Sequence, residues 1–325
     1  MQRCRGSGQR TSTTAGHGVT DRSLIPAFVN PGSGNAEKAR EALASSGHFD
    51  VKEVEPARLK DEIGAAVKAG ARRVLIAGGD GSICSGAAAV CGTDVELAVL
   101  PAGTLNHFAI DSGIPVDFAE ALKVGVGTRT MTVDVGYAGE RVFLNTSSIG
   151  AYVVFVRLRD RLEAKFGYRL ASIIAMIRIF VLMPTVRVAL EVEGTLRNYR
   201  TPLVFIGVGE RELQLPHLGN RVKDGKRGLH VFVVRGRTRA RLLVVAMSAV
   251  ARGVETVRRM PDVDAFLVER CTIDLRRGRA LVAFDGETEL MTTPLEYRIE
   301  RDSLRIVVPE RAEEAVEEAA AAHPA

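Results

Sequence analysis

Short apolar runs alternate with helix-like patterns along the first part of the chain. The apolar runs have the length of strands, and the segments between them carry apolar residues at helical spacing, in the order LIPAFVN, AEKAREALASSG, FDVKEVE, ARLKDEIGAAVKAG, RRVLIAGG, SICSGAAAV and VELAVLPAG. This alternation predicts right-handed βαβ units and a parallel sheet that helices cover on both faces. Ligands of such sheets bind beyond the carboxyl ends of the strands.

The pattern changes after about Val126. The segment RTMTVDVGYAGERVFLNTSSIG predicts a hairpin that turns at residues 138–140, and a long helical pattern follows from about Tyr152 to Met183. Mainly strand-like segments come next, interrupted by one helix over roughly residues 239–252. The predicted fold class is therefore an α/β N-terminal domain with a parallel sheet, followed by a mainly antiparallel β-sandwich domain.

These patterns divide the chain into four segments. We expect a disordered extension over residues 1–22, an α/β domain over 23–128, a β-sandwich domain over 129–309 and an acidic, alanine-rich tail over 310–325. The most apolar window, LASIIAMIRIFVLMP, is shorter than a bilayer span, contains Arg178 and ends at Pro184. It predicts a helix in a core or groove, and it is a candidate wall for an apolar ligand.

Net charge indicates the kind of partner, and cysteine content indicates the cellular compartment. The 325 residues carry a formal charge of +5, which favours anionic partners without choosing among nucleotides, nucleic acids and acidic lipids. The chain has no tryptophan and no aromatic-rich basic segment, so the sequence does not favour nucleic-acid binding. The chain has four cysteines, Cys4, Cys84, Cys91 and Cys271. They show neither metal-ligand spacing nor a disulfide framework, which indicates a protein of the reducing cytosol.

Three glycine-bearing turns follow predicted strands. They are NPGSG at residues 30–34, GGDGS at 78–82 and PAGTLN at 101–106, and all three fall on the same edge of the predicted sheet. GGDGS alone has two interpretations. Asp80 caps the next helix in a tight turn, or it handles a metal or a proton beside a polyphosphate that the glycines let approach the backbone. The convergence of three such turns favours a nucleotide site.

Four ordered motifs resemble one family. NPGSG, GGDGS, PAGTLNHFA at residues 101–109 and FDGE at 284–287 resemble the diacylglycerol kinase catalytic-domain family, which includes bacterial lipid kinases and is related to sphingosine and ceramide kinases. The resemblance implies a first domain similar to phosphofructokinase and NAD kinase and a second β-sandwich domain. ATP with Mg²⁺ and a lipid alcohol would meet in the cleft between them, in the service of phospholipid biosynthesis.

The resemblance also implies roles for individual residues. The nucleotide pocket would be lined by Asn30, Ser33, Gly34, Gly79, Asp80, Gly81 and Ser82, supported by Thr104 and Asn106. Asp285 and Glu287 would reach across the cleft from the second domain. Asp285 is the favoured general base, with Glu287 assisting. Asp80 would organise magnesium and water, and it remains the alternative base.

For other polar residues, the resemblance implies a role beside a structural alternative, or the sequence departs from the family pattern. Lys165 and Arg161 would flank the phosphates, and a solvated helix face is their alternative. His107 is favoured as a structural histidine over a ligand or base. Ser82 replaces the family's usual threonine and Ser85 a frequent glutamate. The segment after residue 207 keeps Asp224 but lacks the usual glycine-rich pattern, and His230 replaces a frequent aspartate, so an accessory structural magnesium site is not expected.

The predicted function is an ATP-dependent lipid kinase, with diacylglycerol as the favoured acceptor and ceramide or a sphingoid base as alternatives. A kinase of a soluble alcohol such as NAD and a binding protein without turnover remain open, although the two cleft carboxylates argue against the latter. We expect a cytoplasmic protein held peripherally at the inner face of an anionic membrane, with a homodimer among the open assemblies. The membrane contact would come from an arginine cluster, namely Arg235, Arg237, Arg239, Arg241, Arg252, Arg258 and Arg259.

Overall fold

The computed structural model describes residues 24–182, 185–213, 218–222, 225–235, 263–276 and 278–310. Several sequence predictions lie outside these residues. They are the extension over residues 1–22, the helix over 239–252, Asp224, the tail beyond residue 310 and every arginine of the predicted cluster except Arg235.

The N-terminal half is built on parallel strands. Strands β1 (Ile25–Val29), β2 (Phe49–Glu53), β3 (Arg73–Gly78) and β4 (Glu96–Pro101) lie in the order β2-β1-β3-β4. The predicted alternation of strands and helices is confirmed here, because every neighbouring pair in this part of the sheet is parallel.

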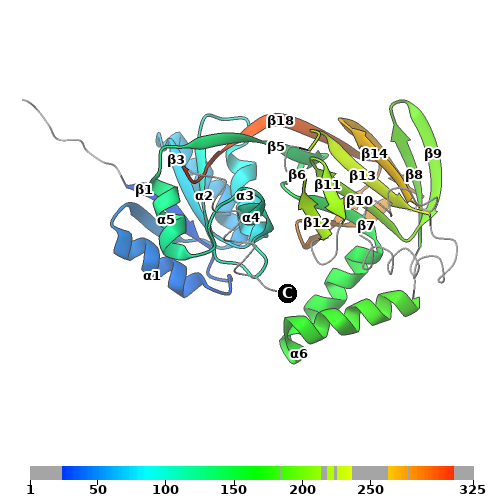
Figure 1. Ribbon diagram of the computed structural model, residues 1–325, viewed down its shortest axis with the longest axis horizontal. Helices are drawn as coiled ribbons and strands as arrows, with labels where there is room; N and C mark the ends of the chain where they lie inside the picture. Colours follow the sequence, from blue (N-terminus) through cyan, green and yellow to red (C-terminus); the bar gives the residue numbers. More distant parts are fainter. Residues whose placement is uncertain are drawn as a thin grey trace, which may run out of the picture.

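Helices cover both faces of the parallel sheet. Helices α1 (Ala36–Ser46) and α5 (Phe118–Val126) pack on one face, and α2 (Pro56–Lys68) and α3 (Asp80–Val90) pack on the other, as Figure 1 shows. Alternate residues of β3 supply the two cores, since Ile76 packs with Ile63 and Ile83 while its neighbour Leu75 packs with Leu43. The short helix α4 (His107–Asp111) follows β4.

The same sheet continues into the C-terminal half. The long strand β18 (Leu295–Val307) pairs in parallel with β4 at its end, and it pairs antiparallel with β5 (Thr130–Ala138) and β15 (Arg270–Leu275). β5 and β18 are the long pair that crosses the upper part of Figure 1. The predicted domain boundary near residue 128 stays a prediction, and the sheet is continuous across it.

A bulge interrupts the pairing of β5 with β18 between Glu300 and Leu304. The Arg227 guanidinium holds this bulge, because it forms ion pairs with Asp134 of β5 and with Asp302, the latter at 2.9 Å. The backbone N–H of Asp302 also donates to the Asp134 carboxylate at 3.0 Å. The two carboxylates raise the pKa of Arg227, so this cation stays charged.

The C-terminal half is a sandwich of two antiparallel sheets. The first sheet adds β6 (Arg141–Phe143), β8 (Val186–Val192) and β9 (Thr195–Thr201) to β5, β15 and β18. The second runs in the order β14-β13-β10-β7-β16-β17, from β14 (Val263–Val268), β13 (Leu229–Val234), β10 (Leu203–Val208), β7 (Thr146–Gly150), β16 (Arg279–Phe284) and β17 (Glu287–Thr292). A small pair, β11 (Arg211–Leu213) and β12 (Leu218–Arg221), lies beside them. The predicted fold class and the hairpin turn at residues 138–140 are confirmed.

One bent helix, α6 (Ala151–Leu182), connects β7 to β8. Gly167 interrupts it with φ 71° and ψ 163°, so residues 151–166 and 168–182 form two limbs that lie below the body of the molecule in Figure 1. Among the described helices, none combines the length and hydropathy needed to cross a bilayer.

Two helix glycines test the packing of the α/β half. A Cβ on Gly86 of α3 would lie 2.6 Å from Cγ1 of Ile76, whereas a Cβ on Gly64 of α2 meets no atom within 4 Å. We expect Gly86→Ala to lower the free energy of unfolding by about 1–3 kcal/mol through overpacking. Gly64→Ala should raise it by about 0.5–1 kcal/mol, because alanine is the better helix former. Urea unfolding measures both, and equal shifts of the two variants would contradict the described packing.

Candidate active site

The three glycine turns meet at the carboxyl edge of the parallel sheet, as predicted. The second and third turns touch through their backbones, since a Cβ on Gly103 would lie 2.5 Å from the Cα of Gly79. Asn106 stabilises the third turn by accepting from the Gly103 N–H and donating to the Gly103 carbonyl, both at 3.0 Å. Asn30 joins the first turn to the second by donating to the Ser82 hydroxyl at 2.8 Å.

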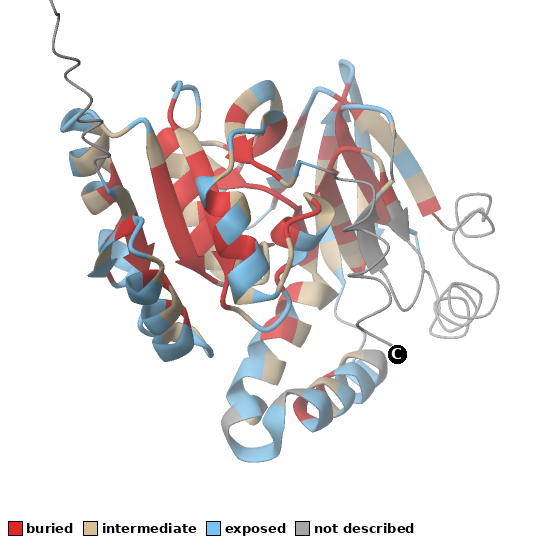
Figure 2. Cartoon of the chain, turned by 60° about the vertical axis from the view of Figure 1, so that its left-hand side comes forward, coloured by how far each residue is buried: buried red, intermediate tan, exposed pale blue. Residues whose placement is uncertain are grey.

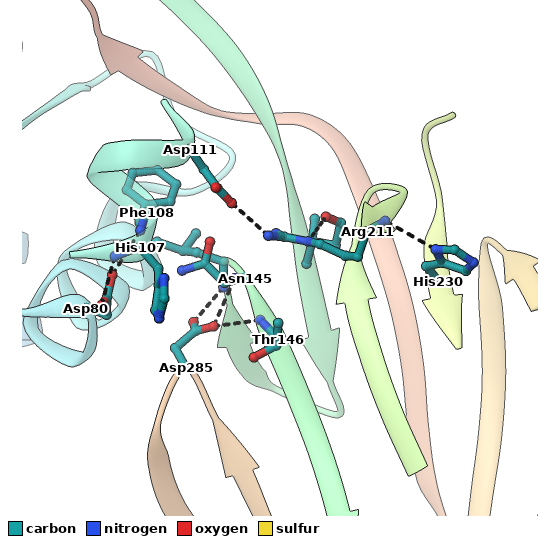
Figure 3. Close-up of polar contacts among 11 residues, drawn as sticks. Asp80, His107, Phe108, Asp111, Asn145, Thr146, Arg211, His230 and Asp285 are labelled. Carbon is teal, nitrogen blue, oxygen red and sulfur yellow. Dashed lines mark hydrogen bonds and ion pairs between the residues drawn. The ribbon is translucent and has the colours of Figure 1, made fainter. Parts of the chain in front are cut away.

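Asp80 is the first residue of α3 and faces α4. The backbone N–H groups of His107 and Phe108 donate to its two carboxylate oxygens at 3.1 and 3.0 Å (Figure 3). The carboxylate thus ties the GGDGS turn to the start of α4, a contact that the capping interpretation did not foresee because it joins two different helices. No ion pair to a described basic residue accompanies these bonds.

Asp285 lies across from this turn, in the connection between β16 and β17. Asp285 and Gly286 have φ of 47° and 91°, which is the two-residue hairpin turn that Asp-Gly favours. The side chain turns inward and accepts from three successive backbone N–H groups, those of Leu144, Asn145 and Thr146, at 2.7, 2.9 and 2.8 Å (Figure 3). One residue therefore forms the hairpin turn and also lines the cavity.

Burial raises the pKa of the Asp285 carboxyl above its ordinary value. The three backbone N–H donors act in the opposite direction, and the negative charge of Asp80 adds to the rise. The electrostatic influence of Asp80 on Asp285 indicates that the two carboxylates share one environment, although they come from opposite halves of the molecule.

Glu287 completes this group from the first position of β17. A Cβ on Gly81 would lie 1.9 Å from its Oε1, so the glycine of the GGDGS turn leaves the space that the glutamate occupies. Arg141 lies 3.4 Å from Glu287 and 3.3 Å from Glu289. This arginine holds Glu287 close to the turn.

A cavity of about 550 Å³ separates the turns from the hairpin. Six of the predicted site residues line it: Gly79, Asp80, Gly81, Thr104, Asp285 and Glu287. Asn30, Ser82 and Asn106 support the turns behind this surface, and Ser33 and Gly34 belong to the first turn without lining the cavity. Ser85 donates its hydroxyl to the Gly81 carbonyl at 3.0 Å. His107, expected to be structural, is exposed and lines the cavity.

The structure does not bring Lys165 and Arg161 to the cavity. Arg159 and Glu163 of the first limb of α6 line it instead. Residues four apart share a helix face, and residues two apart point to different sides, so Arg161 and Lys165 fall away from the cavity. Both are exposed, and the Lys165 ammonium lies 5.2 Å from the centroid of the Phe166 ring.

The sequence prediction also missed a second arginine that lines the cavity, Arg211. Arg211 is buried and forms an ion pair with Asp111 of α4 at 2.7 Å, which crosses from one half of the molecule to the other (Figure 3). Its Nε donates to the Val208 carbonyl, and its backbone N–H donates to Nδ1 of the buried His230 at 3.2 Å. Arg211 lies in the segment whose glycine-rich pattern is altered, so no motif identified it.

The described residues contain no group of three or more His, Cys, Asp or Glu side chains that could hold a metal ion. Each Asp80 oxygen accepts one N–H bond and keeps further acceptor capacity. Magnesium is commonly held by one or two carboxylates together with substrate phosphates. The arrangement fits a metal that arrives with a nucleotide.

Comparison with known proteins confirms the resemblance that the four motifs indicate. Residues 25–138 match the family model described as the diacylglycerol kinase catalytic domain. A Cronobacter sakazakii protein named "Probable lipid kinase YegS-like" is 28% identical over 153 residues, which are 45% of this chain and 50% of that protein. A Mycobacterium tuberculosis protein named "Diacylglycerol kinase" is 33% identical over 121 residues, 34% of this chain and 39% of that protein.

The chain spans about half the length, or less, of the curated relatives it matches first. The fold is similar over a greater length. A solved structure described as a diacylglycerol kinase from Bacillus anthracis str. Sterne superposes with a TM-score of 0.62, covering 88% of this chain and 97% of that one. The sequence identity is 17%, so this likeness concerns the fold.

The ion pair between Arg211 and Asp111 should contribute measurably to stability. The two side chains are only 2% and 14% exposed, so removing one partner leaves the other charge poorly solvated. We expect Arg211→Met or Asp111→Asn to cost about 3–5 kcal/mol in urea unfolding, and the double variant to cost clearly less than the sum.

The exposed pair of Arg58 and Glu62, at 2.8 Å on α2, is the matched control. Removing either of its partners should cost less than about 1 kcal/mol. Additive effects of the Arg211 and Asp111 substitutions would show that the two side chains do not interact in solution.

Proposed function

We propose that this protein is an ATP-dependent lipid kinase, which transfers the γ-phosphate of ATP to the hydroxyl of a lipid alcohol, with diacylglycerol as the favoured acceptor. The observation that carries the proposal is the placement of Asp80 and Asp285 on opposite walls of one cavity. The match of residues 25–138 to the diacylglycerol kinase catalytic-domain model supports it.

The turns supply what a nucleotide requires. Phosphoryl transfer mainly requires the protein to position the reactants and to neutralise the charge of the phosphates. Gly79 and Gly81 line the cavity without side chains, so a polyphosphate can approach the backbone at the N-terminus of α3. Asp80 would hold Mg²⁺ with its remaining acceptor capacity, and the metal would neutralise charge on the phosphates.

Asp285 is the proposed general base. A base works best when its pKa approaches the working pH, and burial raises the pKa of this carboxyl. The three N–H donors fix the carboxylate in one orientation at the cavity wall. An acceptor hydroxyl placed between Asp285 and the nucleotide phosphates would lose its proton to this carboxylate as its oxygen bonds to the γ-phosphorus and the bond from that phosphorus to the β-phosphate oxygen breaks, releasing ADP.

Purified protein with ATP labelled at the γ-phosphate tests the proposal directly. We expect magnesium-dependent label transfer to a lipid alcohol in micelles or vesicles, with diacylglycerol, ceramide and a sphingoid base offered in parallel beside NAD. Label in NAD and in none of the lipids would identify a kinase of a soluble alcohol. Binding of ATP with no transfer to any acceptor would identify a binding protein.

Substitution of the two aspartates tests the assigned roles. We expect Asp80→Asn and Asp285→Asn each to lower turnover by at least ~100-fold, because each removes a charge from the reacting centre. The double variant should fall far less than the product of the two effects, since both act on one transition state. Turnover is measured beside thermal unfolding, because each asparagine also loses one carboxylate acceptor for backbone N–H groups.

Asp117 provides the matched control. Its carboxylate accepts from the Glu120 N–H at the start of α5, outside the cavity lining, so Asp117→Asn removes a capping charge without touching the site. Its turnover should stay unchanged.

The pH dependence of the reaction tests the role of Asp285. In the unmodified protein, kcat/KM should fall with decreasing pH through a pKa above that of an ordinary aspartate, and Asp285→Asn should abolish this fall in kcat/KM at acid pH. Near-normal turnover of folded Asp80→Asn would show that the Asp80 carboxylate is structural and not catalytic.

A further inference from the structure

The second limb of α6 carries an exposed apolar stripe. Leu170, Ile173, Ile177 and Val181 follow one another at helical spacing and are 48–60% exposed. Arg169 and Arg178 are also exposed, and their positions place one on each side of the stripe. An apolar face bordered by arginines is typical of helices that lie in a membrane interface, where long basic side chains reach the head groups.

The described residues of this limb that are fully buried are small. Its fully buried positions are Ala171 and Ala175, which lie one helical turn apart. Figure 2 shows this limb standing apart below the body of the molecule, with pale blue exposed residues along most of its length. The four side chains of the stripe are therefore exposed rather than packed in the core.

A basic hollow lies just beyond the end of this limb. Leu182 ends α6, and Thr185 begins the lining of a surface hollow of about 580 Å³ that also contains Arg187, Arg200 and Arg276. Three residues of chain span at most about 11 Å, so the stripe and the hollow are neighbours. The three arginines come from three places in the sheet, namely β8, β9 and the end of β15.

The arginines of the hollow repel one another. Arg187 and Arg200 are directly opposite in the antiparallel pairing of β8 with β9, an arrangement that is unfavourable for like charges. Arg200 donates to the Thr185 hydroxyl at 3.3 Å, and within the described part of the chain no carboxylate forms an ion pair with any of the three. Asp274 lines an adjoining hollow together with the same three arginines, without an ion pair to any of them. An external anion would relieve this repulsion.

We infer that the stripe and the basic hollow together form the surface by which this protein docks on an anionic phospholipid bilayer. The apolar side chains enter the interface, and the arginines bind lipid phosphates beside it. The first limb of α6 lines the cavity with Tyr152, Arg159 and Glu163, so docking of the second limb holds the cavity beside the head groups. The inference rests on the proposed function for its biological purpose, since a lipid alcohol remains in the bilayer.

This surface differs from the arginine cluster expected from the sequence. Of that cluster, Arg235 lies within the described residues, and its guanidinium forms an ion pair with Asp264 of β14. The arginines of the hollow instead come from three strands that are separated along the sequence. The apolar window over residues 170–184 was expected to form a core or a groove wall, and its described part, residues 170–182, contributes an exposed face.

Co-sedimentation of the full-length protein with vesicles tests the inference. The vesicles are phosphatidylcholine with and without phosphatidylglycerol. One variant combines Ile173→Glu with Ile177→Glu, and another combines Arg187→Glu with Arg200→Glu. The controls are Leu290→Glu, which changes an equally exposed leucine on β17, and Arg72→Glu, which changes an exposed arginine before β3.

We expect the unmodified protein to bind anionic vesicles, more weakly at high salt, and each double variant to bind at least ~10-fold more weakly with unchanged thermal unfolding. The controls should bind like the unmodified protein. Equal binding by the double variants, or no preference for phosphatidylglycerol, overturns the inference. So does a dimer in sedimentation velocity that the isoleucine variant converts to a monomer without loss of vesicle binding, because a second copy would then cover the stripe.

Activity separates this inference from the proposed function. With a short-chain acceptor dispersed in detergent, the docking variants should transfer label as fast as the unmodified protein, and they should be slower only on vesicles. Vesicle binding as expected, with no label in any lipid, would support the docking surface and refute the lipid kinase. Label transfer from vesicles at full rate by both double variants would refute the docking surface alone.

Discussion

The site depends on two carboxylates whose charges are met by backbone N–H groups. Asp80 accepts from the start of α4, and Asp285 accepts from three successive residues that lead into β7. A basic side chain would neutralise each carboxylate fully and move with its own rotamers. Peptide dipoles instead stabilise the charge while the backbone fixes the position, so acceptor capacity remains for a metal or a proton.

These bonds also assemble the cavity. The GGDGS turn is held against the PAGT turn by the contact of Gly79 with Gly103, and against α4 by Asp80. On the opposite wall, the β16–β17 hairpin is held against the sandwich by Asp285. Arg211 and Asp111 then join the two walls at the side of the cavity. The residues that resemble a catalytic motif are thus also the residues that determine the shape of the site.

Local sequence predicted the parts of the site that local rules determine. Glycines after strands predicted the turns, and the Asp-Gly pair at residues 285–286 is a dipeptide that favours the hairpin turn found there. Lys165 was placed by its motif position and Arg161 by helical spacing from it, but Arg159 and Glu163 of the same helix line the cavity instead. Arg211 could not be predicted, because its partner Asp111 is a hundred positions away and neither residue lies in a recognisable pattern. The continuity of the sheet through β18 depends on pairing between distant segments, which no local periodicity encodes.

The paired strands β5 and β18 have a mechanical consequence. They pass side by side from one half of the molecule to the other, and the bulge between Glu300 and Leu304 is held by Arg227. Two halves joined by a single flexible linker can rotate freely about a few residues, whereas rotation here must bend a hydrogen-bonded ribbon. The two halves therefore behave as one elastic body. Exchange of ligands then falls to loops, side chains and the limbs of α6 rather than to a wide opening of the cleft.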